Sequence, residues 1–233
     1  MNQISKPQPA ESLADRAYSR LRSDILGGGF APGQPLRLEP LRARYGYSFS
    51  PLREALTRLA ADRLVSQSSL RGFRVAEFSL AEMWDILRTR ILIEGEALRL
   101  AIDKGDAAWE ARVQATLAAF SHCVTAPGPA DEESRAVFEH YHAVFHGTLI
   151  EACGSPSLLR LARQLYLQTE RYRRPHLMAD SAETVIAEHG ALRDAALARD
   201  AGLACDLLAR HYTRTGEFIE AALARAAPEP VTP

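Results

Sequence analysis

Hydrophobic side chains recur at helical spacing at the start of the chain. The spacing predicts a first helix over residues 13–26, which a run of three glycines ends. Further helices are predicted over 39–45 and 51–62, and in the latter the leucines face inward while Arg53 faces outward. The positions that define the first helix are Leu13, Ala17, Leu21 and Ile25. The chain is therefore expected to open with three short helices.

The connection between the second and third predicted helices carries clear local signals. Gly46 permits a tight turn, and Ser50 is a suitable N-cap ahead of Pro51. Two short β-prone runs follow between residues 64 and 75, around a turn-permissive glycine. Three helices followed by a β-hairpin predict a winged helix-turn-helix domain over residues 11–77.

From residue 79 onward, helical patterns and caps predict an all-α domain. Its six helices are expected to form an antiparallel bundle over residues 78–226, because their connections are short. Asp180 and Glu183 are expected to form a capping box at the fifth helix. The predicted helices span 79–102, 106–123, 131–153, 155–174, 180–199 and 200–226. The fold class is thus mainly α.

Composition is that of an ordinary globular protein, with 47% hydrophobic and 24% charged residues in 233. No apolar run approaches the length of a membrane span, and the N-terminus lacks the apolar block of a signal peptide. We therefore expect a cytoplasmic chain without a membrane partner, whose three cysteines are reduced thiols because they lack C-x-x-C spacing. The tails 1–10 and 227–233 are polar or proline-rich and are expected to be disordered.

Charge is divided unevenly along the chain. Residues 1–77 hold 12 Lys and Arg against 7 Asp and Glu, whereas residues 78–233 hold 16 against 22. The N-terminal domain therefore has a net charge of +5 and the remainder −6. This asymmetry favours a polyanionic partner for the first domain, and double-stranded DNA fits the predicted fold.

The third helix of a winged helix-turn-helix reads DNA in the major groove. Arg53 lies one turn from its start and can contact guanine O6 and N7, whereas a solvated helix face is the alternative for any single arginine. Phe49 cannot donate a hydrogen bond, so it is expected to contact a thymine methyl or a sugar, or to pack against Tyr47. The residues expected to contact DNA are Arg42 and Arg44 at phosphates, Ser48 and Ser50 at a phosphate beside the helix start, Phe49, Arg53, and Arg71 and Gly72 at the wing tip.

Four histidines of the helical domain form a candidate metal site. His142 and His146 lie four residues apart on one helix face, and His189 and His211 lie on the next helices. Two histidines at this spacing preset two metal ligands, and four neutral imidazoles favour zinc, or nickel, over manganese or calcium. Closure by all four would leave no position for a further ligand, and polar core histidines without a metal are the alternative.

Other classes of function have weaker signals. Glu139 and His142 make a single E-x-x-H, which leaves a metal-dependent hydrolase or oxidase in a helical bundle as the enzyme alternative, although a di-iron bundle needs two such motifs. The chain has no H-E-x-x-H, Walker loop, G-x-S-x-G or dinucleotide fingerprint. A helical adaptor without DNA or ligand would leave the predicted wing and the histidines unexplained. We therefore expect a regulator rather than an enzyme.

Motifs along nearly the whole chain resemble the GntR-type transcription regulators of the FadR branch, which carry a helical effector domain called FCD. The N-terminal marks are Ala31-Pro32-Gly33, Leu36, Leu41, Gly46, Ser48, the run from Pro51 to Leu56, Leu59, Leu64-Val65 and Arg71-Gly72. The C-terminal marks are Arg90 with Glu94, Phe145-His146, Cys153-Gly154-Ser155, Glu188-His189, Arg199-Asp200 and His211. Within the branch, residues 48–53 and 142–146 are most similar to the carbon-starvation-induced, glutarate-responsive repressors.

The resemblance implies a homodimeric repressor that a small carboxylate releases from operator DNA. It places the effector at a metal held by His142, His146, His189 and His211. It also implies that Arg90 contacts a carboxylate of the effector, and the alternative for Arg90 is a structural ion pair with Glu94. Arg171 and Tyr172 are further candidates for the same cavity. The chain departs from the family at two positions, where Phe49 replaces a base-reading arginine and His142 replaces an aspartate.

Overall fold

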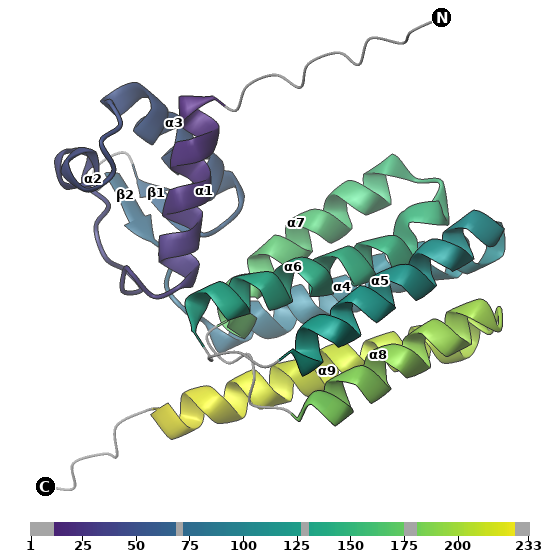
Figure 1. Cartoon of the computed structure of the whole chain (residues 1–233). Helices are drawn as coiled ribbons and strands as arrows, with labels where there is room; N and C mark the ends of the chain where they lie inside the picture. The colour runs from purple at the N-terminus through teal and green to yellow at the C-terminus, as the bar shows by residue number, and fades with distance from the viewer. Residues whose placement is uncertain (1–11, 69–71, 127–130, 175–180, 227–233) are drawn as a thin grey trace, which may run out of the picture. The chain divides into compact units, whose positions relative to one another are not determined.

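The computed structural model describes residues 12–68, 72–126, 131–174 and 181–226. They form two compact units, divided between Glu77 and Phe78 (Figure 1). The first unit contains α1 (Leu13–Leu26), α2 (Leu38–Tyr45), α3 (Phe49–Ala61), β1 (Val65–Ser68) and β2 (Gly72–Val75). The second contains α4 (Leu80–Lys104), α5 (Ala107–Thr125), α6 (Glu132–Ile150), the 3-10 turn η1 (Glu151–Cys153), α7 (Pro156–Arg173), α8 (Ala182–Leu197) and α9 (Ala201–Ala226). The predicted fold class, a winged helix-turn-helix followed by an all-α bundle, is confirmed.

In the first unit, three helices and a hairpin enclose one hydrophobic core. β1 and β2 pair antiparallel with Val65 opposite Val75, so both valines face the core beside Phe73. Leu36 donates its amide hydrogen to the carbonyl oxygen of Phe73 at 2.9 Å and so adds the extended segment before α2 to the hairpin. The hairpin is thereby fixed against the helices.

The start of α3 corrects one prediction. Its N-cap is Ser48, which has an extended backbone, and the helix begins at Phe49, so the predicted cap at Ser50 is wrong. The preceding turn explains the difference. Gly46 ends α2 in the left-handed conformation with φ +74°, and the chain reverses direction within the next two residues, so Phe49 already has helical backbone angles. Pro51 still falls in the first turn, where its missing N–H leaves no helical hydrogen bond unmade.

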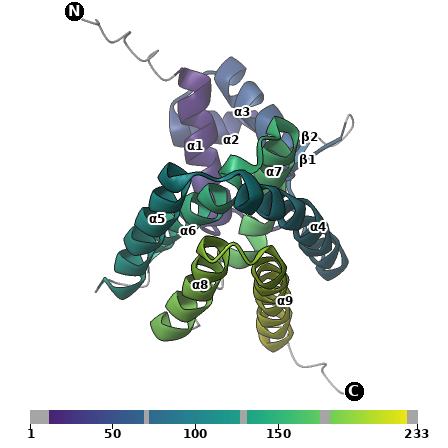
Figure 2. The ribbon, with the colours of Figure 1, turned by 90° about the vertical axis from the view of Figure 1, so that its right-hand side faces the viewer.

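In the second unit, α4, α9, α8, α5 and α6 form a ring of neighbouring helices, and α7 packs on α4 and α6 (Figure 2). The core inside this ring is mainly aliphatic and aromatic, with Trp109 fully buried and its indole N–H donated to the carbonyl oxygen of Thr148 at 2.9 Å. α6, α8 and α9 each turn one face toward the interior of the ring. These three helices carry the four candidate metal ligands.

Two of the predicted boundaries in the bundle were wrong. The helix expected to run to residue 153 ends at Ile150 and continues as η1. The N-cap of α8 is Ser181, whose hydroxyl accepts from the amide of Thr184, whereas Asp180 of the predicted capping box lies outside the described residues. Serine caps helices as well as aspartate does, and Ser181 makes the cap one position later than the prediction placed it.

Candidate metal centre and nucleic-acid surface

The exposed face of α3 carries the predicted recognition residue. Leu52, Leu56 and Leu59 of this helix are buried, and Arg53 and Thr57 lie on its exposed side. Arg53 therefore points away from the core of its own domain. An arginine in this position can contact a base edge without any rearrangement of the helix.

Phe49 lies beside an arginine. The guanidinium of Arg42 stands over the Phe49 ring, 5.3 Å from its centroid, and the Phe49 side chain is 38% exposed. Arg44, in contrast, pairs with Asp24 at 2.6 Å and stands over the Phe30 ring. The Arg42 charge is therefore held at the exposed start of α3, whereas that of Arg44 is shared with a carboxylate.

The remaining predicted DNA contacts lie at the helix start and the wing. Ser48, the N-cap of α3, and Ser50, in its first turn, are exposed next to amides without helical partners. Gly72 begins β2 with φ +69°, a conformation that favours glycine, and Arg71 lies outside the described residues. These predicted contacts stay predictions.

The four histidines meet inside the bundle. His142 and His146 come from α6, His189 from α8 and His211 from α9, and one ligand atom of each lies within 4.8 Å of the others. All four side chains are buried. Two nitrogens bound to one zinc ion are at most about 4.2 Å apart, so a metal would require only a small closure of the cluster.

Each histidine uses its Nδ1 atom in a hydrogen bond with a different group. His189 Nδ1 lies 2.7 Å from the carbonyl oxygen of Val185, which can only accept, so this Nδ1 carries the proton. His211 Nδ1 lies 3.2 Å from the Glu188 carboxylate. Burial opposes ionisation of that carboxyl, but hydrogen bonds from His211 and Arg214 outweigh it and lower the pKa of Glu188 to about 2. His211 Nδ1 is therefore also a donor.

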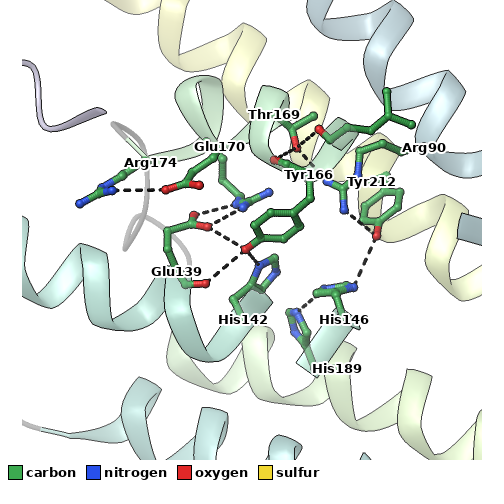
Figure 3. A network of polar contacts seen from close by, with 12 residues as sticks. Arg90, Glu139, His142, His146, Tyr166, Thr169, Glu170, Arg174, His189 and Tyr212 are labelled. Atoms are coloured by element: carbon green, nitrogen blue, oxygen red, sulfur yellow. Dashed lines mark hydrogen bonds and ion pairs between the residues drawn. The ribbon is translucent and has the colours of Figure 1, made fainter. Parts of the chain in front are cut away.

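Two tyrosines fix the other pair of imidazoles. Tyr166 donates to Glu139 at 2.9 Å and lies 3.0 Å from His142 Nδ1, so its oxygen accepts from that nitrogen (Figure 3). Tyr212 donates to Glu94 and lies 3.4 Å from His146 Nδ1. Burial raises the pKa of both phenols well above 10, so they remain neutral donors.

With Nδ1 protonated in all four histidines, each Nε2 atom keeps its lone pair. Nε2 of His146 and Nε2 of His189 lie 3.3 Å apart, so that a proton in the other tautomer, or a metal cation in this one, can lie between them. This distance is close to the edge of a zinc tetrahedron, about 3.4 Å for Zn–N bonds of about 2.1 Å. The donor set therefore fits a divalent metal bound through Nε2.

Protonation does not compete with metal binding at neutral pH. Burial, followed by the neighbouring imidazoles and arginines, lowers the pKa of His142 and His146 well below 6.5. The same causes lower the pKa of His189 to about 3, and burial also lowers that of His211. The cluster is thus neutral at pH 7, the form that metals bind.

Buried ion pairs surround the cluster. Arg90 is 1% exposed and donates to both oxygens of Glu94, at 2.5 and 3.2 Å, and also to Tyr212 and Thr169 (Figure 3). Arg173 donates in the same bidentate way to both oxygens of Glu139, at 2.8 and 2.5 Å. Each Arg–Glu pair reaches a metal-site histidine through one tyrosine. Among the alternatives for Arg90, the structure shows the pair with Glu94.

A cavity of about 270 Å³ opens beside three of the four histidines. His142, His189 and His211 line it, whereas His146 does not. Its walls are mainly apolar, and its charged lining groups are Arg173, Glu188 and Arg214. The volume is near the lower end of small-molecule sites, about 300–1,000 Å³, so the cavity suits a small metabolite.

The structure brings the predicted histidines together, but the residues of α7 that lie beside them are not the predicted ones. Arg171 and Tyr172 do not line the cavity, because they turn to α4, where Arg171 pairs with Glu82 at 2.6 Å. Arg173 takes their place two positions along α7. Sequence reasoning missed Glu139, Tyr166, Arg173, Tyr212 and Arg214 as site residues. Only Glu139 had a signal, as part of the E-x-x-H.

The geometry defines a class of protein: a winged-helix DNA-binding unit joined to a helical unit in which a buried donor cluster adjoins a small cavity. That is the construction of a regulator with a sensor domain. The chain belongs to the GntR family of bacterial regulatory proteins, in the FadR group with an FCD domain, because the gntR family matches residues 13–75 and the FCD domain matches residues 85–214.

Individual relatives support the same assignment. The chain is 42% identical to the HTH-type transcriptional regulator BphR of Paraburkholderia xenovorans (strain LB400) over 86% of this chain and 82% of the relative. It is 34% identical to the HTH-type transcriptional repressor GlaR of Escherichia coli (strain K12) over 89% of this chain and 96% of that protein. The solved structure of E. coli McbR/YncC shares the fold, with a TM-score of 0.72 at 21% identity over 91% of this chain and 99% of that one.

The chain is therefore a DNA-binding transcriptional regulator, and the enzyme alternative is wrong. Its winged helix implies DNA binding and its FCD domain implies effector binding. In the part of the chain that the structure describes, no helix is long and apolar enough to cross a membrane.

Proposed function

We propose that this regulator is a repressor that a small carboxylate releases from its operator. The observation that carries the proposal is the convergence of four Nε2 lone pairs, each fixed by a hydrogen bond at Nδ1, beside a cavity. A divalent metal bound there supplies a positive charge at the inner end of that cavity, where it attracts a carboxylate. The relative named a transcriptional repressor supports the sign of regulation.

The charges near the cluster favour an anionic effector. The pairs Arg90–Glu94, Arg173–Glu139 and Arg214–Glu188 each sum to zero, and the four imidazoles are neutral. A divalent ion would therefore add an uncompensated charge of +2 in a buried place, which is costly unless anionic ligands balance it. A dicarboxylate such as glutarate carries the balancing charge.

The choice of metal bears on how the effector is bound. Zinc closed tetrahedrally by four imidazoles has no open position, whereas a six-coordinate nickel ion would keep two. Three of the histidines line the cavity, so an open coordination position facing the cavity could bind an effector there. Zinc is the first candidate from the donor type, and zinc that binds an effector would need a fifth position.

DNA binding is assigned to α3 of a homodimer. Two copies would present two recognition helices to a palindromic site, and the effector would change their spacing. Arg53 is the base-reading residue of each copy, with Arg42, Ser48, Ser50 and Phe49 beside it at the helix start.

Two measurements test this function. Metal analysis of the purified protein should find about one divalent ion per chain, and His146→Ala and His189→Ala should lose it together with the effector response. In gel shifts, Arg53→Ala should weaken operator binding by about 10- to 100-fold, the loss of one bidentate base contact worth about 1–3 kcal/mol. A metal-free protein with a full effector response would refute the site, and unchanged DNA binding in Arg53→Ala would refute the assigned helix face.

A further inference from the structure

The first side chain of α3 supports an arginine that belongs to another helix. Phe49 begins α3, and its side chain is 38% exposed. The guanidinium of Arg42, on α2, stands over the Phe49 ring at 5.3 Å from the ring centroid. A cation within about 6 Å of a ring centroid is attracted by the negative face of the ring. Arg42 is therefore held at the exposed start of α3 although its own backbone lies in α2.

Phe49 and Arg53 lie on the same face of α3. They are four residues apart, a spacing that places two side chains one above the other on a helix. Arg53 is exposed, whereas Leu52 and Leu56 on the inner side are fully buried. The guanidinium that stands over Phe49 therefore lies beside the helix face that would enter the major groove. Two guanidinium groups flank this face, one from α3 itself and one from α2.

The charge of Arg42 is not shared with a carboxylate. Arg44 offers a comparison two residues further along α2, because it stands over the Phe30 ring and also pairs with Asp24 at 2.6 Å. Over the described residues, no carboxylate forms an ion pair with Arg42. The N–H donors of the Arg42 guanidinium are thus available to a ligand of the domain.

A phosphate contact is the simpler alternative for Arg42. Other groups at the start of α3 can bind a phosphate, because the unpaired amides of the first turn and the exposed hydroxyls of Ser48 and Ser50 lie there. An aromatic ring against one side of a guanidinium restricts its orientation and leaves the donors at its edge, of which two match O6 and N7 of guanine. Holding the guanidinium in this way lowers the entropy lost when a bidentate contact forms.

We propose that Arg42 reads a guanine of the operator beside the base that Arg53 reads, and that Phe49 positions the Arg42 guanidinium for this contact. This rests on the proposed function, because it requires α3 to enter the major groove. It goes further in assigning a base contact to a residue of α2 and a positioning role to Phe49.

Selection of bound duplexes from a random DNA pool tests this without knowledge of the operator. We expect full-length wild-type protein to select a guanine in each half-site that Arg42→Ala does not select, while the other preferred positions stay the same. In the duplex that the wild type selects, replacing this guanine should weaken wild-type binding about 5- to 150-fold and leave the binding of Arg42→Ala unchanged. A phosphate contact would instead give Arg42→Ala an equal loss for every sequence and a salt dependence shallower by about one unit of log–log slope.

Two variants of Phe49 test its positioning role. Phe49→Leu keeps an apolar side chain but has no aromatic face, so the preference for this guanine should fall severalfold. Phe49→Tyr keeps the ring and should keep the preference. Because Phe49 is an exposed residue at the end of a helix, both variants should unfold in urea close to the wild type. If Phe49→Leu retains the full preference, the ring does not position Arg42.

Arg37→Ala is the matched control for the loss of a positive charge. Arg37 is exposed at the N-cap of α2, five residues before Arg42 and about 140° away around the helix. Arg37→Ala should keep the guanine preference, whatever its effect on the affinity for all duplexes.

The outcomes separate this inference from the proposed function. If Arg42→Ala selects the same sequence as the wild type, or loses affinity equally for all duplexes, Arg42 reads no base, while the assignment of α3 still stands on Arg53→Ala. If the wild type selects no sequence, or if Arg53→Ala selects the same sequence as the wild type, the assigned face of α3 is wrong, and this inference fails with it.

Discussion

Lowering the pH from 7.5 to 5.5 should strongly destabilise the helical domain of the metal-free protein. His142 and His146 have pKa values well below 6.5 in the folded state, and that of His189 is about 3, in each case chiefly because burial penalises the charged imidazole. The unfolded chain has no such burial, so its histidines titrate near 6.5. Below this pH the unfolded state binds protons that the folded state does not.

The sign and size of the effect follow from this difference. Stability from these histidines is fully present above pH 6.5 and is lost as the pH falls toward the folded pKa, about 3 for His189. At pH 5.5 each imidazole that stays neutral in the fold costs about 1.4 kcal/mol, since the unfolded chain gains RT ln 11. Three such groups give about 4 kcal/mol, a large part of a typical total of about 5–15 kcal/mol.

The loss of stability can be measured for the helical domain alone. Both tryptophans, Trp84 and Trp109, lie in α4 and α5, and all seven histidines lie between residues 122 and 211. Urea unfolding followed by tryptophan fluorescence in the presence of a chelator therefore reports on the bundle. Among the side chains of an unfolded chain, histidine is the one whose ordinary pKa of about 6.5 falls inside this window, so the change between pH 7.5 and 5.5 belongs mainly to the histidines.

Two variants give the control. His146→Gln should remove up to about one third of the pH dependence, because His146 is one of three strongly shifted imidazoles and His211 is shifted in the same direction. His140→Gln, at an exposed position of the same helix, should leave the pH dependence unchanged. If the free energy of unfolding of the bundle is the same at both pH values, the imidazoles are not held neutral by burial, and the tautomer argument for Nε2 coordination fails.

Two further changes have defined outcomes. Tyr166→Phe should lower metal affinity about 10- to 100-fold in a chelator competition, because it removes the hydroxyl that accepts from Nδ1 of the metal ligand His142. Tyr141→Phe, on α6, should leave the metal affinity unchanged. Equal losses of affinity in both variants would contradict the role assigned to Tyr166. Gly105→Ala should destabilise the bundle by about 1–3 kcal/mol, because the new Cβ would lie 2.2 Å from the Trp109 ring. The Cβ of Gly95→Ala on α4 would meet no atom within 4 Å, so this variant should gain up to about 1 kcal/mol of stability. Urea unfolding followed by tryptophan fluorescence measures both changes, and a loss of stability in Gly95→Ala would refute the packing argument.

Local signals predicted the elements well where one residue type determines the backbone. Gly154 adopts φ +73°, Ser155 caps α7 and Pro156 starts it, as their sequence implies. Asp200 likewise caps α9 through the amide of Leu203 at 2.9 Å. The start of α3 could not be placed from side chains alone, because the geometry of the preceding turn decided it.

The candidate site was predictable only in part for a similar reason. His142 and His146 share a helix, so their spacing alone places them together. The Nδ1 partners of these two histidines come from other helices, 24 residues away for Tyr166 and 66 for Tyr212, and no local pattern records such a contact. On α7 the difference between Arg171 and Arg173 is about 200° of rotation, which neither composition nor spacing resolves without knowing which face of the helix is buried.

The departure at His142 now has a physical consequence. An aspartate at this position would bring a negative charge to the metal and would face Glu139 one turn earlier on α6, whereas the imidazole is neutral and donates to Tyr166, which in turn donates to Glu139. Imidazole therefore relieves a repulsion between two carboxylates but leaves the whole charge of a divalent metal to be balanced from outside the protein. A dianion balances it fully, and the cavity meets His142, His189 and His211 on the side from which such a ligand would come. The replacement of aspartate by histidine therefore favours an effector that brings its own negative charge to the site.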